Sequence, residues 1–148
     1  MSEKLKKLVS ENFYLGLQTQ FDVVERNGWV VITTPFLDRH FDKIQIFMRP
    51  RMLPGVEGEW YISDDGHAMA DWNPADISNQ EGWINEILRA YSINIAPNKD
   101  SNSLFATAVE TSICERIMDM LSVVMIFSNV PLLGSLPAAA TPHPAYSN

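Results

Sequence analysis

The chain has 148 residues, of which 46% are hydrophobic and 20% charged, and its formal net charge is −7 at pH 7. A chain of this length forms one domain and buries roughly 68–70% of the surface that it exposes when unfolded. The single cysteine, Cys114, excludes an intramolecular disulfide and a multi-cysteine zinc site. These features predict a cytoplasmic domain with a core of its own.

Neither a secretory signal nor a membrane span is expected. The basic KLKK near the N-terminus is followed by LVSENFYLGL, in which polar residues 10–12 interrupt any apolar signal core. The most hydrophobic window, LSVVMIFSNVPLLGSL, contains Ser128, Asn129 and Pro131 and is too polar to cross a bilayer as one helix. We therefore expect no membrane association.

Charge is distributed unevenly along the chain. Residues 1–52 carry eight Lys or Arg and six Asp or Glu, whereas residues 53–148 carry three and twelve. An acidic surface repels the phosphate backbone of nucleic acids, so direct nucleic-acid binding is disfavoured. The acidic second part favours a protein partner, in particular a basic one, and a homodimer is the alternative.

The first third of the chain predicts a helix and a β-hairpin. Ser2 can cap a short helix over residues 3–13, which needs packing to be stable. Residues 21–34 predict two strands around Asn27-Gly28, because this pair tolerates the positive φ of a type I′ turn. Pro35 brings no N–H to a ladder and is expected to end the second strand. The apolar face of the helix consists of Leu5, Leu8, Val9 and Phe13.

The middle of the chain predicts further strands. In FDKIQIFMRP, residues 41–50, apolar and polar residues alternate, so Ile44, Ile46 and Met48 should lie on one buried face. The glycine- and proline-containing RMLPGVEGE is a loop. WYISDDGHAMADW, residues 60–72, then predicts two short strands, or one strand and an irregular segment.

The second half predicts two helices. Ser78 and Glu81 have the spacing of a capping box, which predicts a helix over residues 79–91. Residues 94–103 are expected to form a loop, and SLFATAV is a last strand or the approach to a helix over residues 109–128. Asn129 and Pro131 should end that helix. Its inward residues should be Ile113, Ile117, Leu121, Val124 and Phe127.

These elements predict an α+β fold. An N-terminal helix precedes a mainly antiparallel β-sheet with hairpins, and the sheet packs against two C-terminal helices. Residues 1–130 should form the single domain. Residues 131–148, rich in Pro and Ala and containing His143, should form an extended or disordered tail.

Two motifs in this order resemble a known family. The stretch TPFLDRH from Thr34 and the turn Asp64-Asp65-Gly66, followed by a helical second half, are similar to the domain-of-unknown-function 1828 family of bacteria and phages. The resemblance covers roughly residues 1–128. It implies a small α+β domain and brings no established activity.

The acidic stretches offer two interpretations. Asp38, His40, Asp42, Asp64, Asp65 and His67 are residue types that bind Mg²⁺, Mn²⁺ or zinc, and they would form a hydrolytic site if the two loops met. In the interpretation that we favour, Asp65-Gly66 is the turn of a hairpin that pairs Asp64 with His67. On this interpretation no metal is bound.

The DRH stretch has the same two interpretations. It can hold a general base beside an anion-binding arginine. Alternatively, Asp38 accepts hydrogen bonds from backbone N–H groups and Arg39 pairs with a nearby carboxylate, which we favour.

Aromatic and sulfur residues add few candidates. Trp60 and Trp72 would flank the predicted hairpin and could form an exposed aromatic anchor for a partner. Cys114 is expected to be a buried small hydrophobe. The sequence contains no nucleotide-binding or metalloprotease motif, and no cofactor is expected.

These observations predict a non-enzymatic interaction or regulatory module, encoded by a phage or mobile element, that binds a protein partner through an acidic face. The alternative is a metal-dependent hydrolase or nuclease that uses Asp38, Asp42, Asp64 and Asp65. It requires these carboxylates to converge on one ion.

Overall fold

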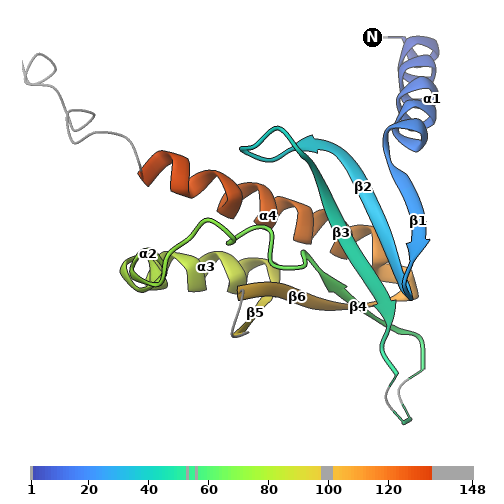
Figure 1. The fold of residues 1–148 in the computed structure, drawn as a ribbon. Helices are drawn as coiled ribbons and strands as arrows, with labels where there is room; N and C mark the ends of the chain where they lie inside the picture. Colours follow the sequence, from blue (N-terminus) through green and yellow to red (C-terminus); the bar gives the residue numbers. More distant parts are fainter. Residues whose placement is uncertain (1, 53, 56, 98–101, 135–148) are drawn as a thin grey trace, which may run out of the picture.

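A six-stranded antiparallel sheet with strand order β1-β2-β3-β4-β6-β5 forms the centre of the molecule (Figure 1). The computed structural model describes residues 2–52, 54–55, 57–97 and 102–134. The strands are β1 (Asp22–Arg26), β2 (Trp29–Leu37), β3 (Lys43–Pro50), β4 (Glu59–Ser63), β5 (Asn94–Pro97) and β6 (Asn102–Val109).

The C-terminal helices lie on one face of this sheet. Within the described residues the helices are α1 (Glu3–Gln20), α2 (Pro74–Asn79), α3 (Glu81–Tyr91) and α4 (Ile113–Gly134), and a 3-10 turn, η1 (Glu110–Ser112), precedes α4. α4 runs across the sheet and contacts β3, β4, β6 and α3. The predicted α+β class, with C-terminal helices on an antiparallel sheet, is confirmed.

The core lies between the sheet and α4. The alternation predicted for β3 is confirmed, since Ile44, Ile46 and Met48 are buried and the intervening side chains are not. The helices contribute their apolar stripes to the same cluster. The fully buried residues of α4 include Met120, Leu121, Val123, Val124 and Phe127.

The predicted β1–β2 hairpin is confirmed. Asn27 and Gly28 both have positive φ, 55° and 80°, as a type I′ turn requires. The prediction that Pro35 ends β2 is wrong, because β2 continues to Leu37. On one side of β2, pairing with β1 ends at Thr33. On the other side, the register with β3 shifts between Thr33 and Leu37. Pro35 therefore lies where neither neighbouring strand needs a hydrogen bond from its backbone nitrogen.

The predicted hairpin at Asp65-Gly66 is wrong. β4 pairs with β3 on one side and β6 on the other, with Ile62 opposite Met48 and Ala106. Both edges of β4 are thus occupied, and residues 64–72 leave the sheet as an irregular run of turns. The alternative of one strand and an irregular segment is confirmed.

The helix boundaries in the second half differ from prediction. Asn73 and Asp76 form the capping box, at the start of α2, whereas Ser78 lies inside α2 and α3 begins after Gln80. Residues 94–97 form the edge strand β5, not a loop, because β6 offers them a partner.

α4 continues past both residues expected to stop it. It runs to Gly134 and so includes four residues of the predicted tail; residues 135–148, with His143, lie outside the described residues. Pro131 has no N–H to donate to the carbonyl of Phe127, four residues earlier. That carbonyl instead accepts a hydrogen bond from Trp72 Nε1 at 2.8 Å, so the helix continues without leaving a buried acceptor unpaired.

α1 is longer than predicted and stands apart from the sheet (Figure 1). Ser2 caps it as expected, through a hydrogen bond from the Leu5 N–H. None of its residues is buried, and within the described chain it makes no extended contact with another element. Among the described helices, none is long and apolar enough to cross a membrane.

Candidate functional site

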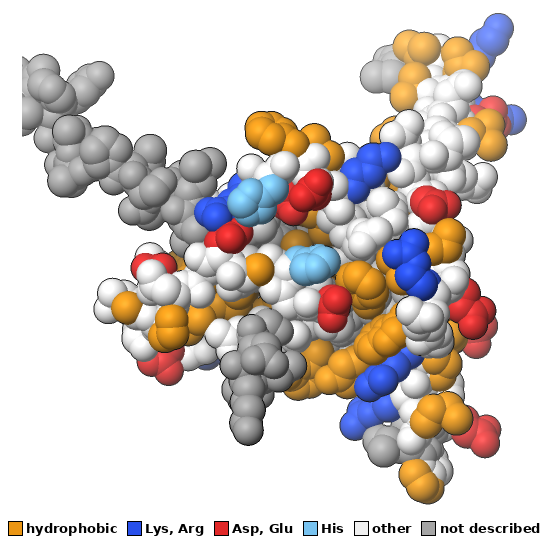
Figure 2. All heavy atoms as spheres, viewed as in Figure 1, with side chains coloured by type: hydrophobic (Ala, Val, Ile, Leu, Met, Phe, Trp, Pro, Cys, Tyr) orange, Lys and Arg blue, Asp and Glu red, His pale blue; other side chains and the backbone are white. Residues whose placement is uncertain are grey.

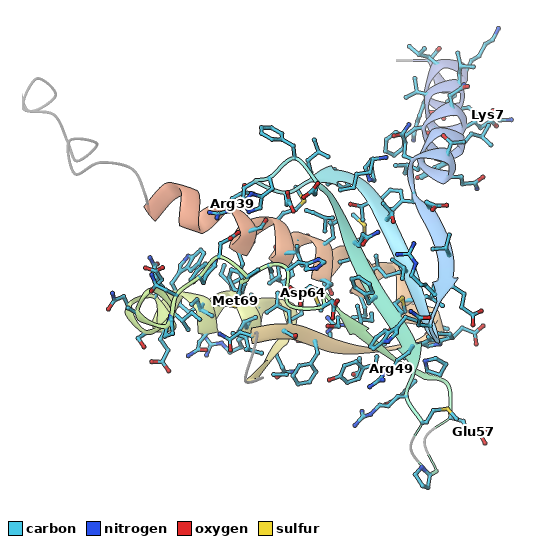
Figure 3. All side chains as sticks on the ribbon, viewed as in Figure 1. Lys7, Arg39, Arg49, Glu57, Asp64 and Met69 are labelled. Atoms are coloured by element: carbon cyan, nitrogen blue, oxygen red, sulfur yellow. The ribbon has the colours of Figure 1, made fainter. Side chains whose placement is uncertain are left out.

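Asp64 is a buried structural carboxylate at the end of β4 (Figure 3). Its side chain is 1% exposed and accepts hydrogen bonds from the backbone N–H groups of Gly66 (2.9 Å), Ala68 (2.8 Å) and Leu104 (2.8 Å). Desolvation raises the pKa of Asp64, and the three N–H groups and the nearby charge of His67 offset part of this rise. The carboxylate thus ties the segment after β4 to β6.

The two residues after Asp64 reverse the chain direction. Asp65 and Gly66 have φ values of 56° and 80°, which Asp and Gly tolerate better than other residues. Asp65 is exposed, and its N–H donates to Ser63 Oγ at 3.1 Å. Turn geometry therefore accounts for the Asp-Gly pair as predicted, although the turn closes no hairpin.

The β2–β3 loop, residues 38–42, is held by Asp38. Its Oδ1 accepts hydrogen bonds from the N–H groups of His40 (2.8 Å) and Asp42 (3.0 Å), and its own N–H donates to the Asp42 carbonyl at 2.8 Å. The prediction that Asp38 accepts from backbone N–H groups is confirmed. This network fixes the path of the loop.

Asp71 joins this loop to the segment after β4. Arg39 donates to Asp71 Oδ2 through Nε (3.0 Å) and a terminal nitrogen (2.9 Å), and His40 Nε2 lies 2.8 Å from the same oxygen. The hydrogen bond with His40 and the charge of Arg39 together lower the pKa of Asp71, against a smaller desolvation effect. The predicted pairing of Arg39 with a carboxylate is confirmed.

Four of the six candidate residues border one pocket. Asp38, His40, Asp42 and His67 line a pocket of about 310 Å³ together with Asp71. Figure 2 shows His, Lys or Arg, and Asp or Glu side chains gathered on this part of the surface. The β2–β3 loop and the segment after β4 therefore meet, as the catalytic interpretation required.

Although the β2–β3 loop and the segment after β4 meet, their carboxylates do not converge as a metal site requires. Within the described part of the chain, no group of three or more His, Cys, Asp or Glu side chains is arranged to hold a metal ion. Asp64 and Asp65 do not line the pocket, and the Asp38 and Asp71 carboxylates already accept hydrogen bonds from within the protein. The predicted convergence of Asp38, Asp42, Asp64 and Asp65 on one ion is therefore wrong.

Phe41 is the most unusual residue of the β2–β3 loop. Its side chain is 82% exposed, and its φ of 65° lies in the left-handed region, which a bulky side chain rarely adopts. Its N–H donates to the Asp38 carbonyl at 3.1 Å. Phe36 and Leu37, at the end of β2, are also exposed, so the loop presents an apolar tip.

A second group of aromatic residues lies on the sheet face opposite α4. The guanidinium of Arg49 lies 4.6 Å from the ring centroid of Trp29 and 5.7 Å from that of Tyr61. Tyr61 stacks on Phe105 with a centroid distance of 5.5 Å. Arg49, labelled on β3 in Figure 3, is exposed, and among the described residues no carboxylate forms an ion pair with it.

Trp60 and Trp72, the residues predicted to form an aromatic anchor, do not belong to this group. Trp72 is only 7% exposed, and its ring packs edge-on against Phe127, so it belongs to the core. Trp60 is partly buried and packs against the same cluster. The prediction for Cys114 is also wrong, because its side chain is exposed.

A comparison with protein-family models matches residues 34–126 to the domain of unknown function DUF1828. The match covers more than half of the chain. This chain belongs to the DUF1828 family. The matched region begins at the TPFLDRH stretch and ends within α4, and α1 and β1 precede it. No curated protein and no solved structure matches the chain.

Two residues that matter at the surface of the DUF1828 domain, Asp71 and Phe41, are not revealed by local sequence patterns. Asp71 follows no recognisable motif, and only the fold brings it to Arg39 and His40. The alternation in residues 41–50 predicts Phe41 as the first residue of a strand, whereas β3 begins at Lys43 and Phe41 lies in the loop before it. The sequence signal for the exposure of Phe41 is its position beside the charged or titratable residues 38–40 and 42, because an apolar side chain is not expected to be buried there.

Proposed function

We propose that this DUF1828 protein is a non-enzymatic interaction module that binds a protein partner through the tip of the β2–β3 loop. The observation that carries the proposal is Phe41, an aromatic side chain that is 82% exposed on a backbone with a φ of 65°. The backbone conformation costs free energy, and the ring gains no stabilisation from burial in the isolated protein. A binding partner that covers the ring would recover part of it.

The cost of each property is considerable. A left-handed conformation of a non-glycine residue costs roughly 1–2 kcal/mol, and an exposed aromatic ring loses the stabilisation of roughly 2 kcal/mol that burial of a large apolar side chain gives. Phe41 contributes nothing to the core that would offset these costs. Strain of this kind concentrates at binding and catalytic sites.

The loop is also preorganised. Asp38 fixes the backbone on both sides of Phe41, and Arg39 and His40 connect the loop to Asp71. A rigid loop loses little conformational entropy on binding, which favours affinity. Aromatic anchors at the centre of an interface often carry most of its binding energy.

The negative charge near Phe41 favours a partner that has basic side chains around the site that binds the ring. Asp42 follows Phe41 directly, is exposed and forms no ion pair with another described residue. The whole chain carries a net charge of −7. Complementary charge around an apolar anchor accelerates association and selects partners. In the bacterial or phage setting that the family resemblance suggests, the partner is a host or cognate protein.

The test compares Phe41→Gly with Met52→Ala. Met52 is an equally exposed apolar residue in another loop, at 88%, so its truncation controls for the loss of exposed apolar surface. Tagged full-length chains are used to capture proteins from a lysate of the source cells, and the captured proteins are quantified by mass spectrometry. We expect Phe41→Gly to lower recovery of the partner at least about tenfold, the equivalent of 1.4 kcal/mol, and Met52→Ala to leave it unchanged.

The stability of Phe41→Gly is measured on the same samples. Glycine relieves the strain at φ 65° but adds entropy to the unfolded chain, so the free energy of unfolding should change by less than about 1 kcal/mol. Loss of capture without loss of stability supports the proposal. Equal capture by wild type and Phe41→Gly would refute it.

A further inference from the structure

α1 presents an apolar face that no other described part of the chain covers. Its large apolar side chains are between 48% and 62% exposed on this face. In a helix of 3.6 residues per turn they occupy one side, with Gly16 among them, whereas Lys7, Glu11 and Gln18 lie on the other. The face consists of Leu5, Leu8, Val9, Phe13 and Leu15.

The body of the protein does not supply the packing that such a helix requires. α1 has 18 residues and makes no extended contact with the rest of the described chain. Figure 3 shows Lys7 on α1 well away from the sheet. An isolated helix of this length is marginal in water, and most helical stability in proteins comes from packing of an apolar face. Another surface therefore has to cover α1.

We propose that the apolar face of α1 pairs with α1 of a second copy of this chain, in antiparallel orientation. This contact uses a different surface from the Phe41 loop and does not depend on the function proposed for it. A two-fold contact needs only one self-complementary surface, which the apolar face provides.

The distribution of charge selects the antiparallel orientation. Lys4, Lys6 and Lys7 all lie in the first two turns of α1, whereas residues 12–20 contain no charged side chain. Lys4 and Lys6 flank the apolar face, whereas Lys7 lies on the far side and pairs with Glu11 at 3.9 Å. A parallel pair would bring the flanking lysines of both copies together, at a cost in repulsion. An antiparallel pair places each lysine cluster beside the uncharged, C-terminal half of its partner, where the negative end of the helix dipole also favours it.

The available area fits a weak dimer. The exposed apolar side chains offer on the order of 400 Å² per copy, since the face is about half to two-thirds exposed and all but one of its side chains are smaller than the roughly 150–250 Å² of an aromatic residue. Two copies together would then bury about 800 Å², below the range of stable interfaces and in keeping with a weak contact. A Cβ on Gly16 would meet no atom within 4 Å, so the backbone is open here and a side chain of the partner helix can approach it closely.

The test measures mass by analytical ultracentrifugation of the full chain from about 5 to 200 µM, the range in which a weak dimer dissociates. Val9→Glu places a charge on the apolar face, and Tyr14→Glu places the same charge on the opposite side of the helix, at a residue that is equally exposed. We expect wild type and Tyr14→Glu to dimerise at high concentration. Val9→Glu should raise the dissociation constant at least about tenfold.

Three outcomes would overturn the proposal. The first is a monomeric wild type throughout this range, and the second is equal dimerisation of Val9→Glu and Tyr14→Glu. The third is loss of the dimer in about 1 M NaCl, which screens charges and would indicate an ionic contact in place of an apolar one.

Orientation is tested by disulfide trapping in a Cys114→Ser background. Leu5→Cys and Thr19→Cys chains are oxidised separately and as a mixture. An antiparallel pair cross-links Leu5→Cys to Thr19→Cys chains in the mixture. Efficient cross-linking of Leu5→Cys chains to one another would instead show a parallel pair and refute the proposed orientation, because the two ends of one helix of 18 residues lie about 27 Å apart.

Discussion

At the scale of single residues, two adjacent carboxylates of the same motif have opposite environments. Asp64 is buried and accepts three backbone N–H groups, whereas Asp65 is exposed and serves the turn through its backbone conformation. The sequence Asp-Asp-Gly does not distinguish them. The difference arises because Leu104 of β6 donates to Asp64 across 40 positions of sequence.

We expect Asp64→Asn to destabilise the fold by about 1–3 kcal/mol. An amide nitrogen would replace one of the accepting oxygens and leave a buried N–H without a partner. Urea unfolding followed by tryptophan fluorescence measures the loss. Asp65→Asn is the matched control and should change the free energy of unfolding by less than about 0.5 kcal/mol, since Asn also tolerates positive φ.

A comparison of wild type with Asp64→Asn at different pH values tests the pKa of Asp64. Burial raises the pKa of Asp64 above its value of 3.8 in the unfolded chain. The stability that this site contributes is therefore complete below 3.8 and falls as the pH rises through the folded-state pKa. The stability difference between wild type and Asp64→Asn should narrow as the pH increases toward neutrality. A difference that widens would contradict the raised pKa.

At the scale of elements, α4 shows how a helix can include a proline. The Phe127 carbonyl, which an N–H at position 131 would normally engage, accepts the indole N–H of Trp72 instead. Trp72 belongs to the segment after β4, so the missing helical bond is replaced by one that attaches this segment to α4. The prediction that Pro131 ends the helix took account only of hydrogen bonds within the helix and not of a donor from another segment.

We expect Trp72→Phe to destabilise the protein by about 1–2 kcal/mol through the lost hydrogen bond, apart from any change in packing. In a Pro131→Ala background the alanine N–H can donate to the Phe127 carbonyl, and the same substitution should then cost less. A double-mutant cycle in urea measures the coupling. A coupling energy of zero would show that the two groups do not share this carbonyl.

At the scale of the whole molecule, the sheet and its C-terminal helices form the stable unit, and α1 is an appendage. Phe21, directly after α1, packs against the core, and its ring contacts Phe36 with a centroid distance of 6.4 Å. The family match also begins after α1 and β1, at residue 34. Folding and self-association should therefore be separable.

We expect a chain that begins with Met followed by Phe21 to unfold with the same free energy as the full chain, within about 0.5 kcal/mol, because no residue of α1 is buried. The comparison is made at a concentration at which both chains are monomeric. Phe21→Ala in the full chain is the positive control and should cost about 1–2 kcal/mol, a fraction of the value for a fully buried Phe. A large loss on removal of α1 would show that it packs on the body.

Local patterns in the sequence determined much of the fold. The Asn27-Gly28 turn, the alternation in β3 and the apolar stripe of α4 each depend on residues close together in the chain, and each was predictable for that reason. The family resemblance followed from equally local motifs. Local periodicity also predicted α1, although it understated its length.

Tertiary structure alone decided which residues meet. Both edges of β4 are occupied by strands distant in sequence, which removed the predicted hairpin and buried Asp64. The same packing placed Asp71 beside Arg39 and left Phe41 exposed. These outcomes depend on contacts between distant segments, whose free energies no local pattern encodes.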